Sequence, residues 1–183
     1  MKFVRHVATW RIFLRLICAN RPLDSIMDIE KVYDRYSVRL YNMSLRIVGD
    51  GFEAEEIMHD TLLQYYRLKD QVKVQDLEKW LSTVCIRKSV DSLRQRKRFL
   101  ACLEEYEDPS LSDVREDNHD FDVARIRDAL QSLPDIYRVV LTLHLFEGYD
   151  YQEISQITEV KEVTIRSIYM RGRKKLADLL KTR

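Results

Sequence analysis

Glycine and proline are scarce in this chain. Its 183 residues include 4 glycines and 3 prolines, and a sheet of many strands needs more turn residues than that. Leucine, isoleucine, glutamate, glutamine, lysine and arginine are plentiful, and these residues favour helix. Hydrophobic residues make up 45% of the chain, which is enough to bury a core. The composition therefore predicts an all-α fold.

Cysteine is also rare, and long apolar runs are missing. Cys18, Cys85 and Cys102 are odd in number and have no CxxC spacing, which argues against a disulfide framework and against a zinc site. No apolar run approaches the ~20 residues of a membrane-spanning helix. We therefore expect a cytoplasmic protein with no membrane insertion, no metal and no cofactor.

The first 26 residues are both apolar and basic. An apolar stretch around Phe13 resembles a signal peptide, but Arg11 and Arg15 interrupt it, which such a segment tolerates poorly. Met27 is followed directly by a well-patterned helix. We interpret residues 1–26 as an N-terminal extension upstream of a misassigned start.

Charge is distributed unevenly although the net charge is only +1. Residues 87–98 hold six basic residues and one acid, and residues 161–183 hold eight basic residues and two acids. Between them, residues 101–124 hold nine acids and one base. These blocks cancel in the sum but not in the local field.

Apolar residues recur at three- and four-residue intervals over 28–48, 54–68 and 77–99, which is typical of amphipathic helices. Three such helices can form a small bundle, so we predict a first domain over 27–100. Residues 101–122 lack this periodicity and are predicted to form an acidic linker. A second small helical domain is predicted over 123–183.

The second domain has the layout of a helix-turn-helix. A short helix at 151–157 precedes a tight connection and a longer basic helix at 163–180. Ile154, Ile165 and Ile168 are spaced to pack the two helices across each other. An outer face remains, made of Arg166, Ser167, Met170 and Arg171, with Arg173 and Lys174 one turn further on.

This outer face is suited to DNA. Arginine can read guanine through paired hydrogen bonds in the major groove, and both arginine and lysine can hold phosphates. The alternative interpretation is a basic helix that is simply solvated.

Two sets of motifs resemble bacterial sigma-70 family sigma factors. Residues 129–141 (ALQSLPDIYRVVL) and 146–155 (FEGYDYQEIS), with the helix that follows, resemble region 4. Upstream, YDRY at 33–36, AEEIMHDTL at 54–62 and DSLRQRK at 91–97 resemble region 2. Nothing resembles regions 1 or 3, and this layout is that of the extracytoplasmic-function (ECF) group.

The resemblance implies a sigma factor, not an enzyme, that binds core RNA polymerase and directs promoter recognition, DNA melting and transcription initiation. Region 4 would read the −35 element through the −35 group, Lys161, Thr164, Arg166, Ser167, Met170, Arg171, Arg173 and Lys174. Region 2 would bind the −10 element through the −10 group, Arg87, Lys88, Asp91, Arg94, Arg96, Lys97 and Arg98. It would grip the polymerase through the polymerase group, Glu55, Glu56, Asp60 and Thr61.

Further partners and segments follow from the same resemblance. The polymerase would be held at its clamp helices and its flap, and an anti-sigma factor is expected as a regulator. Residues 67–76 match a loop that captures a flipped −10 base, or they form an ordinary exposed loop. The acidic linker either threads the RNA path of the polymerase or acts as a flexible spacer.

The chain departs from the family pattern at three positions. Arg87 stands where the family commonly has asparagine, and Glu159 and Val163 stand where it commonly has glycine. A non-glycine residue in a left-handed turn costs energy. We therefore expect the turn of the helix-turn-helix to be built differently.

Two other functions are compatible with parts of the sequence. A stand-alone helix-turn-helix regulator would bind duplex DNA without polymerase. The remote alternative is a di-iron enzyme, because Glu56-x-x-His59 and Glu116-x-x-His119 have the spacing of di-iron ligands in helical bundles.

Overall fold

The chain is described by a computed structural model over residues 23–68, 77–96 and 123–181. Every regular element in these ranges is helical, which confirms the predicted fold class. In chain order the elements are α2 (Leu23–Val48), α3 (Gly51–Leu68), α4 (Leu77–Gln95), α6 (Val123–Gln131), α7 (Asp135–Leu141), the π-helical turn η2 (Thr142–Phe146), α8 (Tyr151–Thr158) and α9 (Glu162–Lys181).

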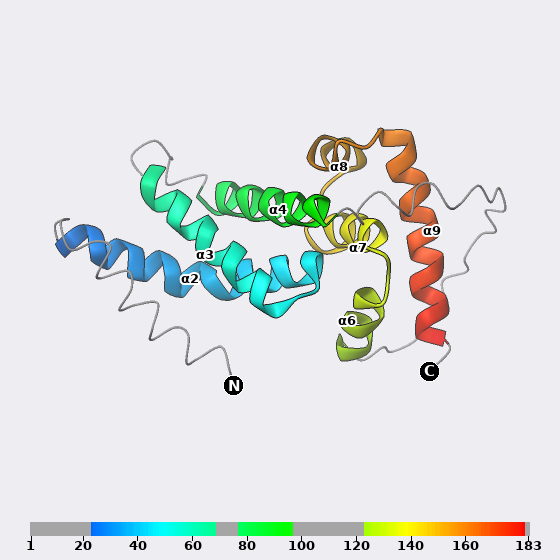
Figure 1. Cartoon of the computed structure of the whole chain (residues 1–183), viewed down its shortest axis with the longest axis horizontal. Helices are drawn as coiled ribbons and strands as arrows, with labels where there is room; N and C mark the ends of the chain where they lie inside the picture. The colour runs from blue at the N-terminus through cyan, green and yellow to red at the C-terminus, as the bar shows by residue number, and fades with distance from the viewer. Residues whose placement is uncertain (1–22, 69–76, 97–122, 182–183) are drawn as a thin grey trace.

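Helices α2, α3 and α4 form the first group (Figure 1). Their facing sides bury Met43, Met58 and Leu81 completely. Helix α2 ends at Val48 because Gly49 turns the chain at φ +78. Its start at Leu23 lies upstream of the predicted residue 28, since no glycine or proline between the two positions interrupts the helix.

Helices α6 to α9 form the second group. Helix α7 begins directly after Pro134 and ends at Leu141. The chain continues as the turn η2, in which the Glu147 amide donates to the Thr142 carbonyl oxygen at 3.3 Å. This wider turn is a form that often occurs at functional sites.

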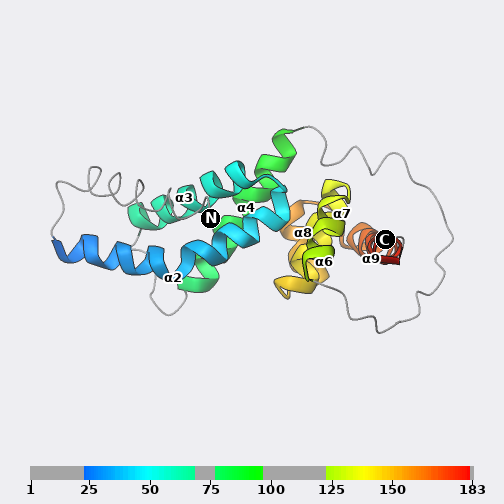
Figure 2. The same cartoon turned by 90° about the horizontal axis from the view of Figure 1, so that it is seen from below.

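The two groups touch along one seam (Figure 2). Helix α2 contacts α6 and α7, and α4 contacts α8. The buried apolar residues of both groups form one continuous cluster. None of the helices within the described ranges is long and apolar enough to cross a lipid bilayer.

Several predicted features lie outside the described residues. These are residues 1–22, most of the loop at 67–76, the acidic linker at 101–122, Lys97 and Arg98, and the second Glu-x-x-His pair at Glu116 and His119.

Candidate nucleic-acid interface

The first helix of the helix-turn-helix, α8, has a defined cap at its start and a defined turn at its end. Helix α8 starts with a capping box, in which the Asp150 carboxylate accepts from the Glu153 amide at 2.7 Å and the Glu153 carboxylate accepts from the Asp150 amide at 3.0 Å. After α8 ends at Thr158, Glu159 takes the left-handed conformation at φ 55 and ψ 23. The turn is thus built with a glutamate where glycine is the usual residue.

Helix α9 is seated on the rest of the second group by its buried face. Ile165 and Ile168 are buried there, as is Ile154 of α8, so the predicted packing of the two helices is confirmed. Gly172 faces α7 closely, because a Cβ atom there would lie 3.2 Å from a ring carbon of Tyr137. This contact fixes how α9 lies across α7.

The opposite face of α9 carries the predicted −35 group. Lys161, Arg166, Met170 and Lys174 are exposed, and the remaining four residues of the group are half-buried. Val163, a departure from the family pattern, is 77% exposed beside them. Lys161 lies directly before α9, and the other seven residues lie along that helix.

Arg166 is held in a defined orientation. Its Nε and Nη2 donate to the same carboxylate oxygen of Glu162, at 3.1 and 2.7 Å. Its guanidinium carbon lies 4.7 Å from the centre of the Tyr151 ring, which is a cation–π contact. Because Glu162 is one turn earlier on α9 and Tyr151 is on α8, both helices of the motif position this arginine.

Tyr151 is packed in an aromatic cluster with His144 and Tyr169. The His144 ring stacks on Tyr151 with centroids 4.6 Å apart and meets Tyr169 edge-on at 4.7 Å. Since a carbonyl can only accept, His144 Nδ1 donates to the Tyr149 oxygen at 2.8 Å. Burial, and then Tyr169, raise the pKa of Tyr151. The cluster joins η2, α8 and α9.

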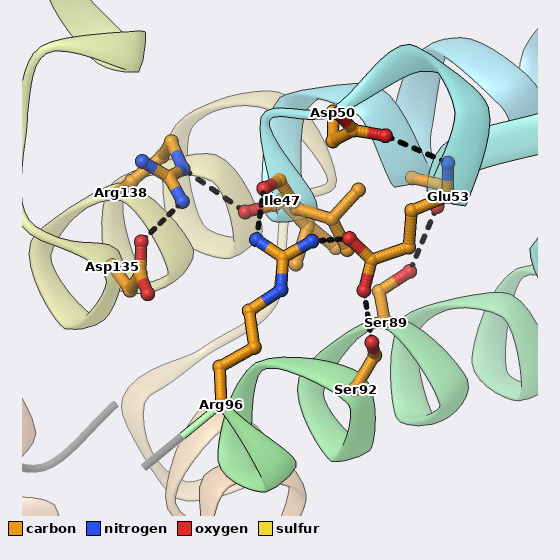
Figure 3. Close-up of polar contacts among 10 residues, drawn as sticks. Ile47, Asp50, Glu53, Ser89, Ser92, Arg96, Asp135 and Arg138 are labelled. Atoms are coloured by element: carbon orange, nitrogen blue, oxygen red, sulfur yellow. Dashed lines mark hydrogen bonds and ion pairs between the residues drawn. The ribbon is translucent and has the colours of Figure 1, made fainter. Parts of the chain in front are cut away.

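The described part of the −10 group lies along α4, except for Arg96, which follows the last residue of that helix. Arg87 is exposed, and the Lys88 ammonium lies 3.8 Å from the Asp60 carboxylate of α3. The Arg94 guanidinium lies 3.3 Å from Asp91. Arg96 forms an ion pair with Glu53 and donates to the Val48 carbonyl oxygen at 3.4 Å (Figure 3).

The polymerase group lies on α3 and is divided by burial. Glu56 and Asp60 are exposed and Glu55 is half-buried. Thr61 is fully buried, and its hydroxyl donates to the Ile57 carbonyl oxygen at 2.7 Å. The assignment of Thr61 is therefore corrected, because a threonine pointing into the core has no surface to offer a partner.

A cleft of about 730 Å³ lies on the surface between α3 and α4. It is lined by members of two predicted groups: Glu56 and Asp60 from α3, and Lys88 and Asp91 from α4 with Arg96 just beyond it. The structure thus brings the acidic and basic candidates to one surface of the first helix group.

Some contacts around the helix-turn-helix had no sequence prediction. The i, i+4 spacing of Glu162 and Arg166 is a pattern that favours pairing on a helix and could have been noticed. The contact of Tyr151 with Arg166, and the stacking of His144 on Tyr151, join different elements and have no local signature.

Comparisons with known proteins agree with this geometry. Residues 32–99 match the model of Sigma-70 region 2, and residues 124–176 match that of Sigma-70, region 4. The ECF RNA polymerase sigma factor SigE of Mycolicibacterium smegmatis is 29% identical over 158 residues, which cover 82% of this chain and 61% of SigE. SigM of Bacillus subtilis is 24% identical over 155 residues, which cover 84% of this chain and 95% of SigM.

A solved structure shares the fold. It is the sigma factor RpoE from Bartonella quintana in complex with the anti-sigma factor NepR, with a TM-score of 0.56 and 22% identity. The similarity covers 85% of this chain and 98% of that one.

An all-helical chain with a region 2 bundle and a region 4 helix-turn-helix defines a promoter-reading transcription factor. The chain belongs to the sigma-70 family of RNA polymerase sigma factors, within the ECF group. Its predicted function in promoter recognition is confirmed, as is the prediction that it is not an enzyme. The match to both regions favours this function over a stand-alone regulator and over a di-iron enzyme.

Proposed function

We propose that the −35 group is the surface through which this sigma factor reads the −35 element. The observation that carries the proposal is the orientation of Arg166 by Glu162 and Tyr151. A recognition helix contacts base edges with its N-terminal residues, and Arg166 lies in the first turns of α9. An arginine that is already oriented loses little side-chain entropy when it binds.

The remaining assignments concern the first helix group. The −10 group on α4 would contact the −10 region, with its positive charge attracting DNA phosphates. Glu55, Glu56 and Asp60 would bind the clamp helices of core polymerase, and region 4 would bind the flap. The acidic linker at 101–122 would join a first domain at 27–100 to a second at 123–183, with residues 1–26 as an extension.

Two broader expectations belong to the same proposal. An anti-sigma factor is the expected regulator, which is supported by the fold shared with RpoE, a sigma factor solved with NepR. The site of action is the cytoplasm, where polymerase and promoter DNA are found.

The first experiment is in vitro transcription of genomic DNA from the source organism with core polymerase, with and without this chain. Mapped 5′ ends that depend on the chain would define its promoters. If no transcript depends on it, the proposed promoter function is wrong.

Substitutions in α9 then test the reading face on the strongest mapped promoter. Arg166→Ala and Arg171→Ala should each weaken −35 recognition by ~1–3 kcal/mol, because each removes a base or phosphate contact. Lys181→Ala is the matched control, since it removes a positive charge at the far end of the same helix. If promoter selectivity is unchanged in both test variants, another face of α9 reads the DNA.

A further inference from the structure

Val163 is the most exposed large apolar side chain in the described part of the chain. It is 77% exposed and is the second residue of α9. It is not a member of the −35 group. An apolar side chain stabilises a fold when it is buried, and a branched side chain slightly lowers helix propensity. The packing of α9 therefore gives no reason for valine at this position.

Val163 faces away from the body of region 4. Successive residues of a helix are rotated by about 100°, because one turn holds about 3.6 residues. The buried face of α9 is made by Ile165, Ile168 and Gly172. Val163 lies roughly opposite the centre of that face on this geometry, so its methyl groups extend outward.

The same outward line continues along α9. Met170 lies seven residues after Val163, at nearly the same angle, and is 40% exposed. Between them lies Arg166, whose guanidinium is held by Glu162 and Tyr151. The outward line thus presents an apolar, a cationic and again an apolar side chain.

Ser167 does not make the surface around Val163 polar. Its hydroxyl donates to the Val163 carbonyl oxygen at 3.4 Å. A hydroxyl that bonds to the backbone of its own helix is directed along the helix and not outward. The surface beside Arg166 is therefore formed by the methyl groups of Val163.

The major groove of DNA offers an apolar group that suits this side chain. It is the C5 methyl group of thymine, which apolar side chains contact, whereas arginine binds O6 and N7 of guanine. The N-terminal residues of a recognition helix contact base edges. Valine has one strongly preferred rotamer in a helix, so it loses little conformational entropy when its methyl groups meet a base.

The spacing along α9 sets which base pair Val163 can reach. Val163 precedes Arg166 by three residues, which is a rise of about 4.5 Å. Stacked base pairs are about 3.4 Å apart. The thymine should therefore lie about one or two base pairs from the base pair that Arg166 contacts.

We propose that Val163 is a specificity-determining residue, which selects thymine at one position of the −35 element through the C5 methyl group of that base. This inference rests on the proposed assignment of α9 to the −35 element. Lys161 and Arg166 flank Val163 and are exposed, and their charges attract DNA phosphates. That attraction brings the apolar side chain against the base edges.

The test removes the methyl group from the DNA and the side chain from the protein separately. Holoenzyme is assembled from core polymerase and the full-length chain, and its binding to the strongest mapped promoter is measured by competition. Each thymine of the −35 element, on either strand, is replaced in turn by deoxyuridine, which lacks only the C5 methyl group. Val163→Ser removes both methyl groups of the side chain. Leu179→Ser is the matched control, since Leu179 is an exposed apolar residue near the far end of α9.

With the wild-type chain, deoxyuridine at one position should weaken binding roughly fourfold, the factor that corresponds to burying one methyl group. With Val163→Ser, the natural promoter should bind roughly fourfold more weakly, and that deoxyuridine should have no further effect. Leu179→Ser should keep the full wild-type response. Val163→Thr, which keeps the branched shape and one methyl group, should restore the response in part.

Three results would overturn the inference. The first is a wild-type holoenzyme whose binding no deoxyuridine weakens. The second is a Val163→Ser variant that keeps the wild-type response, because a defect in folding or in polymerase binding lowers affinity without changing that response. The third is a responsive thymine more than about two base pairs from the pair whose substitution loses its effect in Arg166→Ala.

A promoter with a scrambled −35 element separates this inference from the proposed function. If scrambling does not weaken binding by the wild-type holoenzyme, α9 does not read this element, and the proposed function of the −35 group fails together with the inference. If scrambling weakens binding but no thymine methyl group depends on Val163, the proposed function stands and only the role of Val163 is wrong.

Discussion

The left-handed glutamate in the helix-turn-helix allows a sharp test of backbone strain. Glu159 lies at φ 55, where a side chain costs roughly 1–2 kcal/mol relative to the right-handed conformation. Glycine removes this cost but loses about 0.5–1 kcal/mol more backbone entropy on folding. We therefore expect Glu159→Gly to be more stable than Glu159→Ala by about 1 kcal/mol.

The contribution of the ion pair with Arg94 cancels when Glu159→Gly is compared with Glu159→Ala, because both variants lack the carboxylate. That pair lies at 3.3 Å with Glu159 76% exposed, so it contributes only ~0–1 kcal/mol. Wild type against Glu159→Ala measures it separately. Without this design, relief of strain and loss of the pair would partly offset each other.

The assay is hydrogen exchange of the amides in α8 and the start of α9, which reports local opening. Glu159→Gly should exchange about fivefold more slowly than Glu159→Ala, since 1 kcal/mol corresponds to about that ratio. Glu159→Asn should lie between them, because asparagine tolerates the left-handed region. If alanine protects as well as glycine, the turn is not strained and the reasoning is wrong.

Two other substitutions test local features of the structure. Asp150→Ala should destabilise the protein by about 1 kcal/mol in urea unfolding, because it removes the acceptor for the Glu153 amide at the start of α8. Asp150→Asn should retain most of the cap. Equal losses of stability in the two variants would contradict the capping box. Burial raises the pKa of Cys85 to about 12. In a variant with Cys18→Ser and Cys102→Ser, Cys85 of the folded protein should therefore resist iodoacetamide at pH 8.5 and should react after unfolding. The folded state holds this proton more tightly than the unfolded chain, so the stability it contributes is complete below pH 9 and is lost as the pH rises toward 12. Rapid labelling of the native protein at pH 8.5 would refute the burial.

The helices and the helix-turn-helix could be predicted from sequence because their signals are local. The 3.6-residue period of Ile154, Ile165 and Ile168 identifies the buried face of two helices, and the structure buries all three. Pro134 begins a helix through its fixed backbone angle. The motifs of regions 2 and 4 likewise carry their information in short stretches.

Burial was harder to predict within a motif. Thr61 shares a motif with Glu55, Glu56 and Asp60, but the rotation of α3 against α2 and α4 turns it into the core. The π-helical turn η2 has no local sequence signal. Its hydrogen bonds run from the Glu147 amide to the Thr142 oxygen and from the Tyr149 amide to the Leu143 oxygen, and no residue preference marks them.

Sequence alone therefore determined that this protein is helical and that it carries Sigma-70 regions 2 and 4. Only the tertiary structure decided how those regions meet. Arg138 and Ile47 are far apart in the chain, as are Arg46 and Glu147, and no local pattern marks either pair. The Ile47 carbonyl group at the end of α2 and the Glu147 carboxylate, which is 7% exposed, acquire their partners only when the packed helices bring them together. These contacts are therefore a property of the tertiary fold.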